Sequence, residues 1–185
     1  MTNQSRNGID VILAESLKEL SENRPIDKIT IKEITDKAGV IRPTFYNHFQ
    51  DKYELLEWII REELMNPALP LMDAGMIKEG MTFIFTAMEK EKSFYTKAAK
   101  IEGQNSFGEM IFACAKEIII ERMDYEKVRS KAKYDWVTPE IVAEYYARSL
   151  CVAVMRWIDG GMRVPANEFV EVFMSLAEEP IISIF

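Results

Sequence analysis

The stretch Ile29–Leu56, ITIKEITDKAGVIRPTFYNHFQDKYELL, decides the fold of this chain. Thr30 followed three residues later by Glu33 is the capping-box pattern with which an α-helix begins. Gly39 offers the left-handed backbone that ends such a helix at low cost. A second short helix is expected over residues 42–48, with a proline in its first turn, where a missing N–H costs nothing. Two short helices joined at a glycine predict a helix-turn-helix.

The flanking segments extend this unit to a three-helix head. Residues 8–23 repeat apolar side chains at helical spacing, and an Arg-Pro pair ends that helix. Asp51 is the predicted N-cap of a further helix, over residues 51–65, that leads out of the head. We therefore expect a helix-turn-helix domain over residues 1–50, followed by a connecting helix.

Inside the head, Val40, Phe45 and Phe49 are expected to fill a small core. The side chains left for the outer face of the second short helix are Arg42, Thr44, Tyr46, Asn47 and His48. A helix-turn-helix reads the major groove of DNA with such a face. Arg42 is the candidate for a bidentate contact to guanine, and an exposed arginine near a helix start is the alternative.

The remainder of the chain, residues 66–185, is predicted to be a helical body. Asn66-Pro67 and Pro70 indicate a boundary over residues 66–75. Thr138-Pro139 is a strong helix start, and Gly160-Gly161 is the matching stop. The helices expected beyond the boundary lie near residues 76–90, 91–101, 106–128, 138–159 and 165–179. The fold class predicted for the whole chain is all-α.

Residues 29–56 resemble the signature of the TetR/AcrR family of transcriptional regulators. The resemblance is carried by Ala-Gly-Val at 38–40, Thr-Phe-Tyr-Asn-His-Phe at 44–49 and Asp-Lys-Tyr-Glu-Leu-Leu at 51–56. It covers about 50 of the 185 residues. In that family the rest of the chain is an all-helical body that varies widely, dimerises through its last helices and usually holds an inducer pocket.

The resemblance implies DNA-binding roles for named residues. Thr30 would cap the first short helix and touch a phosphate, while Ile31 and Lys32 would approach the backbone and the groove edge. Arg42, Pro43 and Thr44 fill the base-facing start of the recognition helix. Tyr46 and His48 match phosphate-contacting positions, as does Lys52 at the start of the next helix. A structural role for His48 is equally open.

Two residues depart from the family pattern. Ile41 stands where a capping serine is common, so the first amides of the recognition helix need water or a phosphate. Thr35 replaces a small alanine and is expected to crowd the turn slightly.

The last two helices are more apolar than one buried stripe requires, which favours half of an intermolecular four-helix bundle. An ordinary intramolecular helix pair is the alternative. The residues assigned to the dimer interface are Ile141, Tyr145, Leu150, Val154, Trp157, Phe169 and Phe173.

Methionine and aromatic side chains gather in residues 72–123, where they form either a filled core or an apolar pocket. The stretch Trp157–Met162 resembles the end of the C-terminal domain in a Gram-positive branch of the family. That branch includes activators of dihydroxyacetone kinase operons, some of which act with a second, ligand-sensing protein.

Charge and residue composition limit the classes of function that this chain can have. The net charge of −7, with eight Lys/Arg against ten Asp/Glu in residues 1–60, predicts weak non-specific DNA binding and a modest salt slope. One histidine and the distant Cys114 and Cys151 offer no catalytic or metal cluster, so we expect no enzyme, no cofactor and two reduced thiols. The polar start and the absence of a long apolar run predict a cytoplasmic protein without a membrane partner.

The sequence thus predicts a homodimeric, sequence-specific regulator that binds a double-stranded DNA operator and responds to a small-molecule effector or to a partner sensor protein. The alternative is a helical co-regulator that depends on a partner protein for sensing or for DNA contact. Both repression and activation of transcription stay open.

Overall fold

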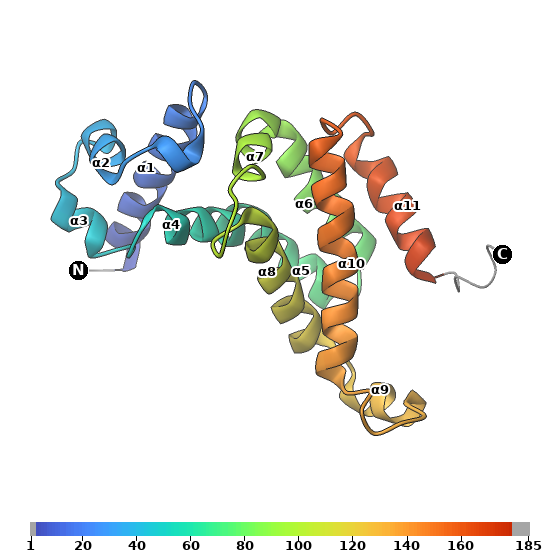
Figure 1. The fold of residues 1–185 in the computed structure, drawn as a ribbon. Coiled ribbons are helices and arrows are strands. Elements are labelled where there is room, and N and C mark those ends of the chain that lie inside the picture. Colours follow the sequence, from blue (N-terminus) through green and yellow to red (C-terminus); the bar gives the residue numbers. More distant parts are fainter. Residues whose placement is uncertain (1–2, 179–185) are drawn as a thin grey trace.

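The computed structural model describes the backbone of residues 3–178 and the side chains of residues 8–177. Every regular element in this range is a helix, which confirms the all-α prediction (Figure 1). In chain order they are α1 (Asn3–Ser21), η1 (Ile26–Lys28), α2 (Ile31–Ala38), α3 (Arg42–Tyr46), α4 (Lys52–Ile59), η2 (Ile60–Met65), α5 (Asn66–Asp73), α6 (Ile77–Lys90), α7 (Lys92–Ala98), α8 (Phe107–Arg122), α9 (Tyr125–Lys131), α10 (Pro139–Asp159) and α11 (Ala166–Glu178).

The head consists of α1, α2 and α3 and lies at one end of the molecule (Figure 1). Its core is made of fully buried aliphatic and aromatic side chains, namely Leu13, Leu17, Ile26, Ile29, Ile34 and Phe45. As predicted, Phe45 and Phe49 are buried, while Val40 packs against this core from a half-buried position. The recognition helix α3 ends at Tyr46, two residues before the predicted end.

The segment α4–η2–α5 joins the head to the body without the expected break at residues 66–75. A proline ring clashes with the carbonyl group four residues earlier in an ordinary α-helix. Immediately before Pro67, η2 is a π-helix, in which the N–H of Asn66 reaches the carbonyl of Arg61, and this wider turn accommodates the ring. The helical path ends instead at Gly75, whose φ of 78° is a left-handed conformation.

The body consists of α6 to α11. In Figure 1, α8 and α10 run side by side and α11 lies against α6, an arrangement that matches the residue contacts. The single helix expected over residues 106–128 is wrong, because Asp124 caps a separate helix, α9, by accepting a hydrogen bond from the N–H of Lys127. No side chain of α9 is buried, so packing does not hold this helix in line with α8.

The C-terminal helices begin as predicted. Thr138 caps α10, with Pro139 in its first turn, and the helix stops before Gly160. The end expected for the last helix near residue 179 lies outside the described residues. Cys114 and Cys151 are both free and buried, and burial raises the pKa of the Cys114 thiol to about 11. None of the described helices has the length and apolar character needed to cross a bilayer.

Candidate nucleic-acid interface

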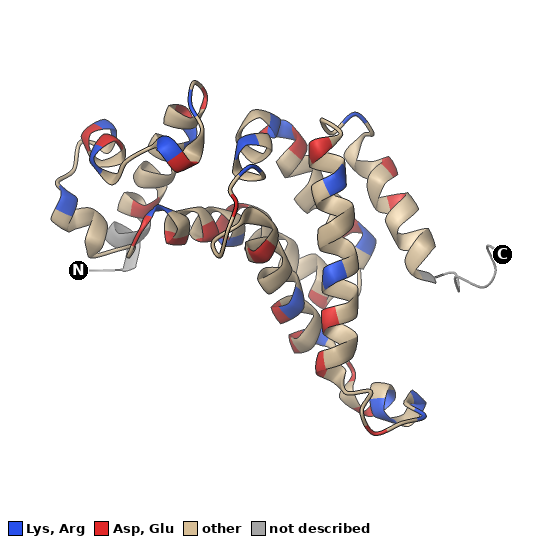
Figure 2. Cartoon of the chain, in the orientation of Figure 1, with Lys and Arg blue, Asp and Glu red and all other residues tan. Residues whose placement is uncertain are grey.

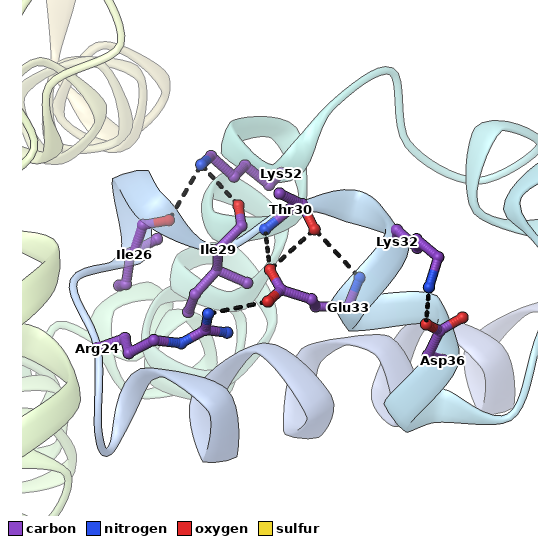
Figure 3. A network of polar contacts seen from close by, with 8 residues as sticks. All are labelled: Arg24, Ile26, Ile29, Thr30, Lys32, Glu33, Asp36 and Lys52. Carbon is purple, nitrogen blue, oxygen red and sulfur yellow. Dashed lines mark hydrogen bonds and ion pairs between the residues drawn. The ribbon is translucent and has the colours of Figure 1, made fainter.

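The start of α2 is held by the predicted capping box (Figure 3). Thr30 Oγ1 accepts a hydrogen bond of 3.3 Å from the N–H of Glu33, and the Glu33 carboxylate accepts one of 2.8 Å from the N–H of Thr30. Arg24 binds the other carboxylate oxygen at 2.8 Å. The Arg24 guanidinium, followed by the backbone of Thr30, lowers the pKa of Glu33 to about 2. The cap is therefore ionised at neutral pH.

The turn between α2 and α3 depends on Gly39, which has a φ of 68°. Thr35, expected to crowd this turn, is 1% exposed and donates its hydroxyl to the carbonyl groups of Ile31 and Lys32, each at 3.0 Å. Its polar atom is therefore satisfied inside α2. The threonine is accommodated without an unpaired group.

The recognition helix α3 presents a polar outer face, as predicted. Phe45 anchors the helix inside the head and contacts the ring of Phe49 at a centroid distance of 5.9 Å. Ile41 gives α3 no side-chain cap and is 69% exposed. The side chains of Arg42, Pro43, Tyr46 and Asn47 are exposed, and that of Thr44 is half-buried.

His48 departs from the predicted outward orientation. Its side chain is only 9% exposed, and its Nδ1 atom lies 2.6 Å from Oδ1 of Asp10 in α1. Asp10 is itself buried. The pair ties the end of α3 to α1, so His48 positions the recognition helix rather than standing on its outer face.

Lys52 also has intramolecular partners. Its Nζ atom donates to the carbonyl oxygens of Ile26, Asp27 and Ile29, at 3.0, 2.6 and 2.8 Å, and two of these bonds are drawn in Figure 3. An ammonium group has three N–H donors, so all of them are used. Burial lowers the pKa of Lys52. The predicted phosphate-binding lysine therefore clamps η1 in the described structure and supports the loop that carries Thr30.

Most cations of the head form ion pairs with acidic side chains. Figure 2 shows basic and acidic residues interspersed along this part of the chain. Lys32 pairs with Asp36 at 2.7 Å on the exposed side of α2, and Lys37 pairs with Glu19. Within residues 8–177, Arg42 makes no ion pair. The positive charge available to DNA from α3 is thus concentrated in this one side chain.

A polar junction between head and body was not predicted. Lys18 in α1, with a side chain only 11% exposed, pairs with Glu15, Glu63 and Glu91 at 2.8, 2.8 and 3.2 Å. Burial alone would lower the pKa of Lys18, but its bonds to Glu15 and Glu63 outweigh burial and raise it. From α7, Lys97 binds the carbonyl groups that end α1. Sequence reasoning missed the junction because Glu63 and Glu91 follow Lys18 by 45 and 73 residues.

The body contains a cavity of about 280 Å³, which decides between the two roles expected for its methionine and aromatic residues. Met72, Met81, Met88 and Phe85 line this cavity. In contrast, Phe94, Tyr95 and Phe107 are buried in the core. Met65 at the end of η2 also lines the cavity, so the connecting segment forms part of its wall.

The residues predicted for the dimer interface range from buried to exposed. Val154 and Trp157 are 1% and 6% exposed and lie inside the protomer, which corrects their assignment to a surface. Trp157 stacks on Phe169 at a centroid distance of 5.0 Å. Leu150 and Phe173 are half-buried and line the cavity together with Val154.

Other apolar side chains of α10 and α11 remain uncovered. Of the predicted set, Ile141 and Tyr145 are exposed. The exposed residues that the prediction missed are Val152, Val172 and Leu176. Val152 follows Tyr145 by seven residues, and Leu176 follows Val172 by four. This spacing was the available signal, because residues so separated lie on the same face of a helix.

Among the described residues, no His, Cys, Asp or Glu cluster could hold a metal ion.

Comparison with known proteins found a matching family for the N-terminal head and another for the C-terminal body. Residues 12–59 match the family described as bacterial regulatory proteins, tetR family, and residues 76–179, more than half of the chain, match a transcriptional regulator C-terminal region. A similar curated protein is the HTH-type dhaKLM operon transcriptional activator DhaS of Lactococcus lactis subsp. lactis (strain IL1403). It is 25% identical over 142 residues, which are 76% of this chain and 74% of that protein.

Solved structures share the fold. The dihydroxyacetone kinase operon activator DhaS superposes with a TM-score of 0.65 at 19% identity, over 91% of this chain and 93% of that one. The repressor FadR of Thermus thermophilus, solved in complex with lauroyl-CoA, gives a TM-score of 0.63 at 17% identity, over 90% and 92% of the two chains.

Proposed function

The chain belongs to the TetR family of bacterial regulatory proteins and is a DNA-binding transcriptional regulator, and from this premise we propose that it acts in the cytoplasm as a homodimer on a specific double-stranded operator. Residues 1–50 form the DNA-binding domain in this proposal, and residues 66–185 form the dimerisation and effector-binding domain. The observation that carries the proposal is Arg42, which is exposed and makes no ion pair among the described side chains, on a recognition helix anchored by Phe45.

The contacts to DNA are assigned from the position of each residue in the helix-turn-helix together with its exposure. Arg42, Pro43 and Thr44 lie at the start of α3, from which a helix-turn-helix reaches base edges. The residues assigned to the DNA backbone are Thr30, Ile31, Lys32, Tyr46 and Asn47. His48 and Lys52 act indirectly, by fixing α3 against α1 and by holding the loop before α2.

Dimerisation is supported by the uncovered apolar side chains of α10 and α11, including Tyr145, Val152 and Leu176, which are 69%, 57% and 61% exposed. Two copies related by a two-fold axis would bury these faces as a four-helix bundle. The two recognition helices must then lie about 34–36 Å apart, one turn of B-DNA, to enter successive major grooves.

Ligand response is supported by the path from the cavity to the head. Met65 lines the cavity, and Glu63 on the same π-helical turn binds Lys18 of α1. A molecule that displaces Met65 therefore acts on a segment attached to the head. In this proposal ligand entry alters the separation of the two heads and so changes operator affinity.

The proposal is tested by gel shift of the full chain with the native upstream region of its gene, at low and moderate salt, followed by footprinting. We expect a retarded complex that survives moderate salt and a protected site with two-fold symmetry. Operator binding is contradicted if unrelated DNA is retarded to the same extent. It is also contradicted if the upstream region is not retarded at either salt concentration.

A partner-dependent co-regulator is a second candidate, favoured by the exposed end of the body near α9. Trp136 and Tyr134 are 67% and 55% exposed there, and aromatic side chains are enriched at protein interfaces. A gel shift that fails with this chain alone but succeeds after addition of the candidate partner supports this alternative.

A further inference from the structure

Ile41 is an apolar side chain that the head leaves uncovered at the start of its recognition helix. It is 69% exposed, and among the described residues no large aliphatic side chain is more exposed. A single exposed apolar residue needs no explanation on most protein surfaces. Ile41 differs by its position, because it directly precedes α3, which lies at the outer edge of the head (Figure 1). Side chains at this end of a recognition helix face the base edges of the major groove.

The local structure gives no reason for an isoleucine at this position. Ile41 is the N-cap residue of α3, but its side chain makes no cap hydrogen bond. Its backbone carbonyl already accepts the N–H of Thr44 at 2.9 Å and that of Phe45 at 3.4 Å, and Pro43 has no N–H to satisfy. Ile41 is also absent from the apolar side chains that pack against the core, where Phe45 anchors the helix. The isoleucine side chain therefore serves neither the cap nor the core.

The major groove of DNA offers one apolar group to such a side chain. The base edges present hydrogen-bond donors and acceptors, apart from the C5-methyl group of thymine. An isoleucine pressed against a donor or an acceptor would remove that group from water without a replacement hydrogen bond, which is unfavourable. Contact with a thymine methyl group instead buries apolar surface on both partners.

Arg42 indicates where the thymine lies. Its side chain is exposed, makes no ion pair within residues 8–177 and is assigned to a base contact. Consecutive Cα atoms are about 3.8 Å apart, which is close to the spacing of about 3.4 Å between base pairs of B-DNA. Ile41 and Arg42 can therefore address neighbouring base pairs.

We propose that Ile41 is a specificity-determining residue that contacts the C5-methyl group of a thymine, at the base pair next to the one that Arg42 contacts. The inference rests on the proposed operator binding. It deepens that function by naming an apolar determinant of the operator sequence beside the charged one.

The test replaces thymine by deoxyuridine, which removes the methyl group and leaves the hydrogen-bonding groups of the base unchanged. Each thymine in one half-site of the footprinted operator is replaced in turn, and fluorescence anisotropy measures the dissociation constant of the full chain at one salt concentration. At a thymine beside the base pair at which Arg42→Ala acts, we expect affinity to fall about fourfold, as for one buried group of methylene size.

Variants of Ile41 connect the methyl group to this side chain. In Ile41→Ala the preference for thymine over deoxyuridine at that position should disappear, whereas Ile41→Val, which keeps a branched apolar side chain, should retain it. Ile12→Ala removes another exposed isoleucine of the head, in α1, and is the matched control that should keep the preference. Because Ile41 is exposed, its variants are expected to fold as the parent does, and circular dichroism checks this.

The inference is overturned if no thymine of the half-site depends on its methyl group, or if the dependence is the same in Ile41→Ala as in the parent. It is also overturned if the thymine that loses its effect in Ile41→Ala lies away from the base pair that Arg42 contacts. Specific operator binding with any of these results refutes this inference and leaves the proposed function in place. Failure to bind any specific site refutes the proposed function, and this inference with it.

Discussion

Nζ of Lys18 lies 2.8 Å from Oε1 of Glu63, so an ion pair joins the first helix of the head to the π-helical turn that borders the cavity. Lys18 is largely buried, and burial raises the pKa of Glu63. A shift of this turn therefore acts directly on α1. We predict that Glu63→Gln removes about 1 kcal/mol of the coupling between ligand and operator, within the range known for residues that connect two sites.

The measurement is operator affinity with and without saturating ligand, in parent and variant. Glu62→Gln is the matched control, because Glu62 stands on the same turn but is exposed and binds only Asn66 among the hydrogen bonds described. Equal coupling in both variants would assign transmission to another contact.

Arg42 is predicted to specify a base. Arg42→Ala should cost about 1–3 kcal/mol of operator binding, concentrated at one base pair, because a bidentate arginine–guanine contact is lost. Fluorescence anisotropy against single-base variants of the footprinted operator measures this, and Lys127→Ala in the distant α9 is the control. A uniform loss on every sequence would show that Arg42 contacts phosphate only.

Lys52 is predicted to stabilise the head rather than to bind phosphate. Lys52→Met deletes three hydrogen bonds to backbone carbonyl groups and should lower the free energy of unfolding by about 1–3 kcal/mol. Urea denaturation measures the loss, and Lys28→Met, at an exposed lysine of η1, is the control. If Lys52 instead bound a phosphate, Lys52→Met would leave the free energy of unfolding unchanged and would reduce the salt slope of DNA binding by about one.

The helix cap of α2 should titrate at unusually low pH. The pKa of Glu33 falls from 4.5 to about 2 on folding, chiefly because Arg24 binds its carboxylate. A depressed folded-state pKa contributes stability that is fully present above the unfolded value and is lost as pH falls from about 4.5 through about 2. NMR titration of the Glu33 carboxyl should show this midpoint.

Arg24→Gln should move that midpoint upward, toward the unperturbed value. Lys28→Gln, which removes an exposed lysine paired with Asp27, should leave it in place. An unchanged midpoint in Arg24→Gln would place the cause of the shift in the backbone of Thr30 instead.

The exposed faces of α10 and α11 should hold the dimer together. Val152→Glu and Leu176→Glu each put a carboxylate into the proposed interface and should weaken the dimer by about 3 kcal/mol or more, because an unpaired charge is costly to bury. Sedimentation analysis measures the dissociation constant. Trp136→Glu, an equally exposed apolar position outside this face, should have no effect.

Structural features that depend on neighbouring residues were predicted well from the sequence. The capping box of Thr30 and Glu33, the left-handed Gly39 and the caps at Asp51 and Thr138 all depend on atoms within a few residues. Pro67 shows where a local rule fails. It predicts a break, but the π-helical turn before it widens the helix and lets the chain continue into the body.

Side-chain orientation was harder to predict, since it depends on distant partners. His48 was placed on the outer face with a structural role left open, and Asp10, 38 residues away, draws it inward. Val154 and Trp157 fit an interface by their apolar character alone. Trp157 is buried by packing against Phe169 of α11, and Val154 lines the cavity. Helical periodicity cannot distinguish such packing within the protomer from packing against a second subunit.

The amino-acid sequence by itself determined that residues 30–46 form a capped helix, a glycine turn and a short second helix, because these features rest on hydrogen bonds and backbone angles of neighbouring residues. Only the tertiary structure decided that Lys52 and His48 have intramolecular partners, that Arg42 makes no ion pair within residues 8–177, and that the body contains a cavity next to η2. The physical reason is that charge neutralisation and void volume depend on which distant side chains meet, and periodicity does not specify those meetings.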